Sequence, residues 1–103
     1  MGKHRVIAKV FDKRKRLLAE GVNSYKKTNP LMRKAMEATG AKNWSYLHAE
    51  VAALLKVKDW TKAHSIEIYR FTKDGLPALA KPCTCCQWVI EQAGIKPWNI
   101  HHT

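Results

Sequence analysis

Residues 80–89 read AKPCTCCQWV and place three cysteines within four positions, after a proline and before an apolar stretch. Cys83 and Cys86 are three residues apart, so at a helix start both sulfurs lie on one face of the first turn. The helix dipole and the exposed N–H groups of such a turn favour thiolates. A metal site, a redox pair and a buried structural cluster all remain open on the cysteines alone, with the metal site favoured.

Residues 46–56, YLHAEVAALLK, supply the second half of the pattern at the start of another predicted helix. Two thiolates and the imidazole of His48 give zinc three protein ligands and leave the fourth position to water, as in catalytic zinc sites. Zinc lowers the pKa of bound water to about 7, and Glu50 is a nearby carboxylate that can carry protons. Alone, a His-x-Glu pair is more often a cap or a solvent-facing pair, so the prediction rests on the joint pattern.

Composition sets the wider limits. The chain has 103 residues, enough for the single domain that we predict over residues 1–103. Nineteen Lys and Arg against eight Asp and Glu give a net charge of +11, which favours anionic partners such as nucleotides or nucleic acid. Three crowded cysteines argue against a disulfide framework. The sequence shows neither a membrane-spanning run nor a signal peptide, so we predict a cytoplasmic protein without a membrane partner.

Apolar periodicity and turn residues predict the order of strands and helices. Pro30 at a first helical position and Gly40 after the last turn bound one predicted helix. Strands separated by helices predict an α/β domain with part of its sheet parallel. The predicted elements are strands at 5–11, 16–22 and 65–71, helices at 30–40, 46–58 and 83–93, and a short strand that ends at the C-terminus.

His-Ala-Glu opens one helix, a strand intervenes, and Pro-Cys-x-x-Cys opens the next helix, which is the signature of zinc-dependent nucleobase deaminases. The chain therefore resembles the cytidine deaminase-like superfamily, especially its deoxycytidylate and polynucleotide branch. It looks like a minimal version of the kind found in phage genomes, and the resemblance spans residues 5–103. It implies a three-layer α-β-α fold, with a mixed four- to five-stranded sheet and an N-terminal β-hairpin, and a Zn²⁺ cofactor.

The resemblance also implies roles for individual residues. Glu50 would protonate the ring nitrogen of the base and pass the water proton to the leaving amine. The Ala49 backbone N–H would contact the base, and Asn23, in LAEGVNS, would hold the nucleoside. Cys85 falls outside the motif spacing, and we interpret it as a small buried side chain near the site. The implied zinc ligands are His48, Cys83 and Cys86.

The predicted reaction converts cytosine to uracil in a free (deoxy)cytidine nucleoside or nucleotide. A deaminase acting on cytosine or adenine in single-stranded DNA or RNA is the alternative, because basic residues cluster at the predicted hairpin tip, at Lys13, Arg14, Lys15 and Arg16, and again after Asn23. Lys26 and Lys27 follow Asn23 and are predicted phosphate or strand contacts. Trp44 and Tyr46 are predicted to stack on a base, with core packing or a subunit interface as the other interpretation.

A function of another class also fits the sequence. The chain would then be a non-catalytic zinc module that binds nucleic acid through its basic surface. Such a site needs a fourth protein ligand, for which His101 and His102 are the candidates. Glu50 favours the enzyme, since a structural site has no need of it. We further predict a homo-oligomer, because deaminases of this superfamily usually assemble and the four tryptophans offer apolar surface.

Overall fold

The computed structural model describes residues 5–24, 30–40, 48–72, 74–78 and 82–102. Its sheet has five strands in the order β2-β1-β3-β4, and β5 also pairs with β3. All pairings are antiparallel except that between β3 and β5, so the sheet is mixed. The strands are β1 (Arg5–Phe11), β2 (Leu17–Val22), β3 (Ser65–Phe71), β4 (Pro77–Ala78) and β5 (Ile100–His102).

One face of the sheet forms the floor of the hydrophobic core. In β1, Val6, Ala8 and Val10 are buried at every second position. Ala8 pairs with Ile68 and Val10 pairs with Ile66, both of which are also buried. Directly paired residues point to the same face, so this register places the apolar side chains of both strands together. Alternation in the sequence is therefore a correct guide to the strands and their facing.

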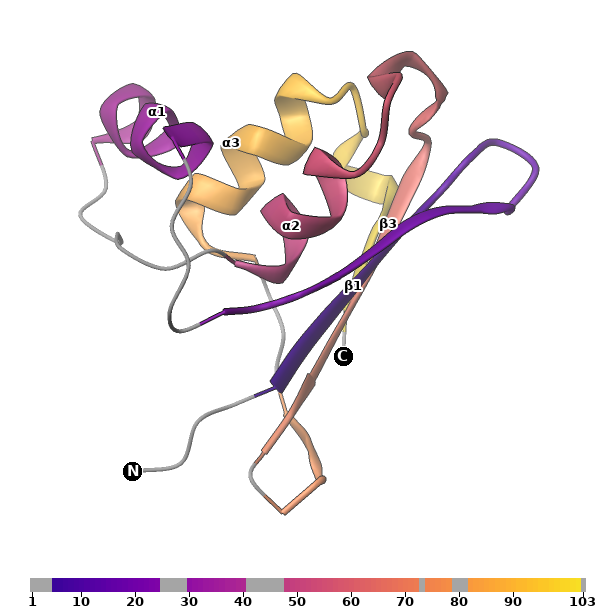
Figure 1. Cartoon of the computed structure of the whole chain (residues 1–103), viewed down its shortest axis with the longest axis vertical. Coiled ribbons are helices and arrows are strands. Elements are labelled where there is room, and N and C mark those ends of the chain that lie inside the picture. Colours follow the sequence, from indigo (N-terminus) through magenta and orange to yellow (C-terminus); the bar gives the residue numbers. More distant parts are fainter. Residues whose placement is uncertain (1–4, 25–29, 41–47, 73, 79–81, 103) are drawn as a thin grey trace.

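The helices are α1 (Pro30–Thr39), α2 (Ala49–Leu55) and α3 (Thr84–Gln92), and two short 3₁₀ turns are η1 (Trp60–Lys62) and η2 (Pro97–Asn99). In Figure 1 the three helices lie on the same side of the sheet, with α2 nearest the strands and α1 beyond α3. The predicted α/β class, the mixed sheet and the N-terminal hairpin are confirmed. Among the described elements the helices cover one face of the sheet, so the second helix layer of the predicted three-layer arrangement is not seen in this part of the chain. Among the described helices, none has the length and apolar character needed to cross a membrane.

Helix α2 is shorter than the predicted 46–58 at both ends. His48 is extended, with ψ of 152°, and so precedes the helix as its N-cap. At the other end the N–H groups of Lys56 and Val57 donate to carbonyls three residues back, which tightens the last turn and ends the helix. Asp59 then caps η1 by accepting the N–H of Thr61 at 3.0 Å. Apolar periodicity did not reveal this break.

Gly21 fixes how closely α2 approaches the sheet. A Cβ at this position would lie 2.3 Å from the backbone nitrogen of Ala53 and 2.8 Å from the carbonyl oxygen of Ala49. Because both atoms belong to the helix backbone, neither has a side-chain rotation that could relieve the contact. Glycine therefore lets β2 touch the first turns of α2, which places the start of that helix beside the end of β2.

Candidate metal centre

The two helix starts that carry the sequence motifs lie next to each other. His48 is the N-cap of α2 and Cys83 is the N-cap of α3, and both have extended backbone. Cys86 lies in the first turn of α3, where its N–H donates to the sulfur of Cys83 at 3.4 Å. Since cap residues project beyond the helix, the two helices present their first side chains to a common space.

The three predicted ligands converge in that space. Nδ1 of His48 lies 3.1 Å from Sγ of Cys86 and 3.5 Å from Sγ of Cys83. All three ligand atoms lie within 4.8 Å of one another. Zinc bonds of about 2.3 Å to sulfur and about 2.0 Å to nitrogen, in a tetrahedron, separate such donors by roughly 3.5–3.8 Å. The three side chains are therefore positioned to bind a metal ion, and the donor set suits zinc.

Proton sharing within the cluster prepares one ligand for a cation. The Cys86 thiol, together with His48 and the Cys86 N–H, lowers the pKa of Cys83 to about 4. Conversely, the hydrogen bond to Cys83 and burial hold the pKa of Cys86 well above its usual range. The same thiolate raises the pKa of His48. Thus Cys83 carries the negative charge at neutral pH, while Cys86 holds a proton that a metal would displace.

Glu50 lies in the first turn of α2 and is only 5% exposed. Burial is the main cause that raises its pKa, and the imidazole of His48 partly opposes this effect. Its carboxylate also interacts with the Cys86 side chain. Because Glu50 is buried, its pKa depends on the neighbouring histidine and cysteines more than on contact with bulk water. The arrangement brings together a cation site and a carboxyl that can take up or give a proton.

Asn23 and Ala49 lie at the same end of the sheet. Asn23 follows Gly21 by two residues, and its N–H donates to the Val6 carbonyl at 3.2 Å. Its side-chain Oδ1 accepts the N–H of Val6 at 2.9 Å, which ties the segment after β2 to the start of β1. Ala49 is the first residue of α2 and is fully buried. The contacts of both residues with a base or a sugar remain predictions.

The other predicted residues separate into two groups. Lys26, Lys27, Trp44 and Tyr46 lie outside the described residues. Cys85, in contrast, is fully buried in α3, and its sulfur lies 3.8 Å from the hydroxyl of Thr39 on α1. It points to the interface between α1 and α3 and does not belong to the metal cluster. This placement agrees with its interpretation as a buried packing side chain.

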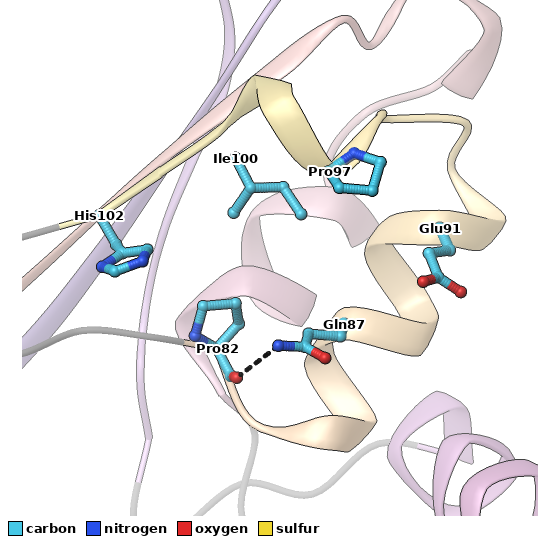
Figure 2. Close-up of a pocket in the computed structure, with 6 residues that line it drawn as sticks. All are labelled: Pro82, Gln87, Glu91, Pro97, Ile100 and His102. Atoms are coloured by element: carbon cyan, nitrogen blue, oxygen red, sulfur yellow. Dashed lines mark hydrogen bonds between the residues drawn. The ribbon is translucent and has the colours of Figure 1, made fainter.

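The C-terminal histidines lie on β5 and are not part of the cluster of described ligands. His101 pairs with Glu67 of β3 and is exposed. His102 lines a hollow of about 290 Å³ between α3 and β5, shown in Figure 2 with Pro82, Gln87, Glu91, Pro97 and Ile100. Within the described residues, the cluster able to hold a metal contains only His48, Cys83 and Cys86. A fourth histidine ligand therefore finds no support in this part of the chain.

Sequence reasoning missed Arg70 as a neighbour of the site. Arg70 pairs with Val6 and Ala78, in the register that continues the buried face of Ile66 and Ile68. Its charge acts on His48 and lowers the pKa of that imidazole, against the larger effect of Cys83. The sequence SIEIYRF did indicate this position, because Arg70 follows Ile66 and Ile68 at every second residue and so places a cation on the inward, otherwise apolar face of the strand.

Comparison with known proteins adds independent information. The family model described as cytidine and deoxycytidylate deaminase zinc-binding region matches residues 1–102. A solved structure of a mutant cytidine deaminase from Mycobacterium tuberculosis is similar with 20% identity and a TM-score of 0.46, covering 91% of this chain and 67% of that chain. Likeness at that level supports no inference about substrate. None of the curated proteins matches the chain.

Proposed function

The chain belongs to the cytidine and deoxycytidylate deaminase zinc-binding family, and from this premise we propose that it converts cytosine to uracil by hydrolysis. The proposed substrate is a free (deoxy)cytidine nucleoside or nucleotide. One observation carries the proposal: the buried Glu50 lies beside a cluster of three metal-ligand atoms, in the first turn of the helix that His48 caps. A three-ligand site leaves one position open for water, and a carboxyl beside it has a use in proton transfer.

His48, Cys83 and Cys86 would hold the zinc ion. Bound there, zinc would supply a Lewis acid that lowers the pKa of a bound water to about 7. Glu50 takes the proton from the attacking water and gives it to the ring nitrogen next to the amine-bearing carbon. It then carries the remaining proton of that water, from the hydroxyl group now on the ring carbon, to the departing amino group, which leaves as ammonia while the carbon becomes a carbonyl. Burial keeps bulk water from competing for these protons, since only 5% of the residue is exposed.

Two backbone-anchored residues would orient the base and sugar. The Ala49 N–H at the start of α2 is free of the helix ladder by its position and can donate to the base. Asn23, whose Oδ1 accepts the N–H of Val6, is proposed to contact the nucleoside through its side-chain amide. Lys26 and Lys27 are proposed to meet phosphate, and Trp44 and Tyr46 to stack on a base.

A polynucleotide substrate is the second candidate, and the charge of the chain favours it. The net charge is +11, more than a small neutral or singly phosphorylated substrate requires. Long-range attraction by such a charge raises the rate at which polyanions associate. The non-catalytic zinc module is less well supported, because a closed site needs a fourth ligand and does not explain a buried Glu50.

The deciding experiment incubates zinc-loaded protein with cytidine, deoxycytidine, their phosphates, adenosine and single-stranded DNA and RNA. Mass spectrometry then identifies the compound in which an amino group has been replaced by a carbonyl oxygen. We expect turnover of at least one free cytosine compound, and about a thousandfold slower turnover with Glu50→Gln. Turnover of polynucleotides alone would select the second candidate. Absence of turnover on the whole panel, with zinc stoichiometrically bound, would reject the enzyme.

We also propose one domain and a homo-oligomer in the cytoplasm. Trp98 is 74% exposed and Leu76 is 63% exposed, and large apolar side chains at such positions are common in subunit contacts. Light scattering of the zinc-loaded protein tests the assembly. A species with a multiple of 11.8 kDa is expected, and a persistent 11.8 kDa particle at micromolar concentration would contradict it.

A further inference from the structure

A basic hollow lies at the end of the sheet opposite the metal cluster. It has a volume of about 370 Å³ and forms where the turn between β1 and β2 meets η1. Its ionisable lining consists of Lys13, Arg14, Arg16, Lys62, His64 and Asp12. Four permanent cations against one carboxylate give this hollow a strong positive potential, to which phosphate groups are the natural complement.

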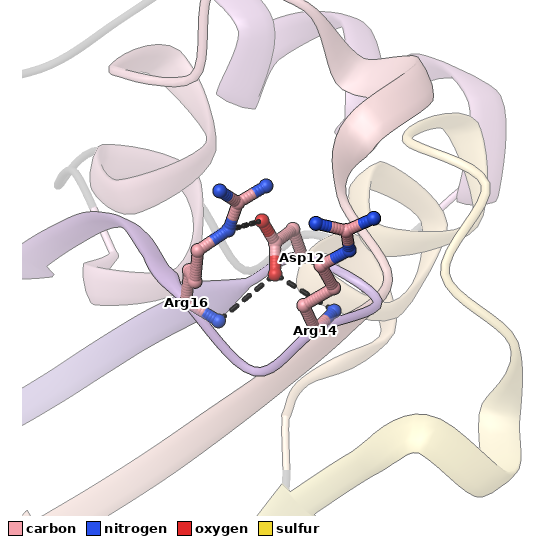
Figure 3. A network of polar contacts seen from close by, with 3 residues as sticks. All are labelled: Asp12, Arg14 and Arg16. Atoms are coloured by element: carbon pink, nitrogen blue, oxygen red, sulfur yellow. Dashed lines mark hydrogen bonds and ion pairs between the residues drawn. The ribbon is translucent and has the colours of Figure 1, made fainter.

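The hairpin turn that forms one wall is held in a defined conformation. Oδ1 of Asp12 accepts the N–H groups of Arg14 and Arg16, both at 2.9 Å, as Figure 3 shows. Oδ2 of the same carboxylate accepts Nε of Arg16 at 2.8 Å. Asp12 is itself only 8% exposed, so it organises the turn from beneath while the basic side chains remain outside. The conformation of the turn is therefore set by hydrogen bonds within the protein itself.

The opposite wall is tied to the same strand end. Asp59 caps η1 through the N–H and the hydroxyl of Thr61, and the N–H of His64 donates to the Phe11 carbonyl at 2.9 Å. These bonds keep Lys62 next to the hairpin turn, although some fifty positions separate the two segments in the chain. Both walls thus hold exposed cations around one space without a movement of the backbone.

Distance separates this hollow from a nucleotide at the metal. Asn23 and Val6 mark the metal end of β1, and Asp12 follows its other end. Six residue steps of about 3.3 Å place the two ends roughly 20 Å apart. Figure 1 shows the hairpin turn and the start of α2 at opposite ends of the strands. One nucleotide has its phosphate a single sugar away from its base, so it cannot occupy both places.

We propose that the basic hollow binds the phosphate backbone of a single-stranded polynucleotide. A single small anion gains little from exposed lysines and arginines, because each exposed ion pair contributes at most about 1 kcal/mol. A strand, however, places several phosphates against neighbouring cations and gains from the counterions that it releases. The inference stands apart from the proposed reaction, since it concerns binding at a place remote from the metal cluster.

The test uses a strand of about 16 thymidines, which carries no exocyclic amine, so that binding is measured without turnover. Fluorescence anisotropy compares the zinc-loaded protein with Arg14→Gln/Lys62→Gln and with the matched control Arg33→Gln/Lys96→Gln. Arg33 and Lys96 are exposed and do not line the hollow, and both double variants lose the same charge. Thermal unfolding verifies that each variant is folded.

We expect the hollow variant to bind about tenfold more weakly and to lower the slope of affinity against salt by about 1.4, the loss of two phosphate contacts. The control pair should change affinity by no more than about threefold. Equal losses in the two pairs would overturn the proposal, because the attraction would then be diffuse. Inorganic phosphate that shifts the amide resonances of Arg14 and Thr61, while the strand does not, would overturn it as well by making the hollow a site for small anions.

Discussion

Nδ1 of His48 lies 3.1 Å from Sγ of Cys86, although 38 residues separate the two in the chain. The contact exists because each residue belongs to the first turn or cap of its own helix and the two helices begin side by side. Nδ1 also lies 3.5 Å from Sγ of Cys83, so this nitrogen is positioned to bind a metal ion together with the two sulfurs. The other nitrogen, Nε2, is left for a second hydrogen bond that can fix the ring.

Zinc binding should release protons. Cys83 is already a thiolate at pH 7, whereas the raised pKa values of Cys86 and His48 keep protons that the metal must displace. Both groups therefore bind metal better as pH rises. We expect release of about one to two protons per zinc at pH 7, measured by calorimetry in buffers of different ionisation enthalpy. In Cys86→Ala the number of protons released per zinc should fall by about one. Release of almost no protons by the unmodified protein would contradict the assignment of Cys86 and His48 as protonated metal ligands.

Substitutions of Glu50 and of Cys83 should both reduce turnover, but for different reasons. Glu50→Gln keeps the shape of the side chain and should lower turnover about a thousandfold while zinc content stays near one per chain. Cys83→Ala should lose both activity and zinc, because it removes the ligand that is charged at neutral pH. Zinc content by mass spectrometry and steady-state rates on the same preparations separate the two effects.

Cys85→Ala is the matched control for these variants. Its sulfur contacts Thr39 at the α1–α3 interface and does not join the cluster, so the variant should keep its zinc. Loss of zinc in Cys85→Ala that equals the loss in Cys83→Ala would show that the ligand set has been chosen wrongly.

Local signals in the sequence were sufficient for the elements that carry the site. Ile66 and Ile68 alternate with polar residues, and β3 has the predicted limits Ser65–Phe71. Pro30 opens α1, which ends at Thr39, just before Gly40. Cap and turn residues act over a few positions, so a single sequence reveals them. The motif residues at the two helix starts could therefore be named before their distances were known.

Relationships between distant segments could not be predicted in this way. The end of α2 depends on how its last carbonyls meet Trp60, whose Nε1 donates to the Leu54 carbonyl at 2.8 Å. Arg70 is a neighbour of His48 only because β3 lies next to β1. The basic hollow likewise forms between segments that meet through the sheet. Such features follow from strand order, which one sequence does not specify.

Gly21→Ala should destabilise the protein strongly. Its methyl group would meet the Ala53 nitrogen at 2.3 Å, so β2 and α2 must move apart. We expect a loss of about 3 kcal/mol in the free energy of unfolding, the upper end of what overpacking costs, measured by denaturant titration. Gly75→Ala is the control, because Gly75 has open space around it and a φ of +81°, which costs only about 1–2 kcal/mol. Equal effects of the two changes would show that the close approach is not rigid.

The turn carboxylate Asp12 should make stability depend on pH. Hydrogen bonds from the Arg16 backbone N–H, and then from its guanidinium, hold the pKa of Asp12 below its usual value. Because the pKa of Asp12 is lower in the folded state, the ionised carboxylate stabilises the fold fully above the pKa of an unfolded Asp, about 3.9. This stabilisation disappears as the pH falls through the pKa of the folded state. Asp12→Asn should therefore lower the Tm at pH 7, and the difference from the unmodified protein should shrink below about pH 4. Asp74→Asn, at an exposed turn, removes the same charge and should change the Tm little at either pH. A Tm difference for Asp12→Asn that stays constant down to pH 2 would mean that the ionised carboxylate does not hold the turn.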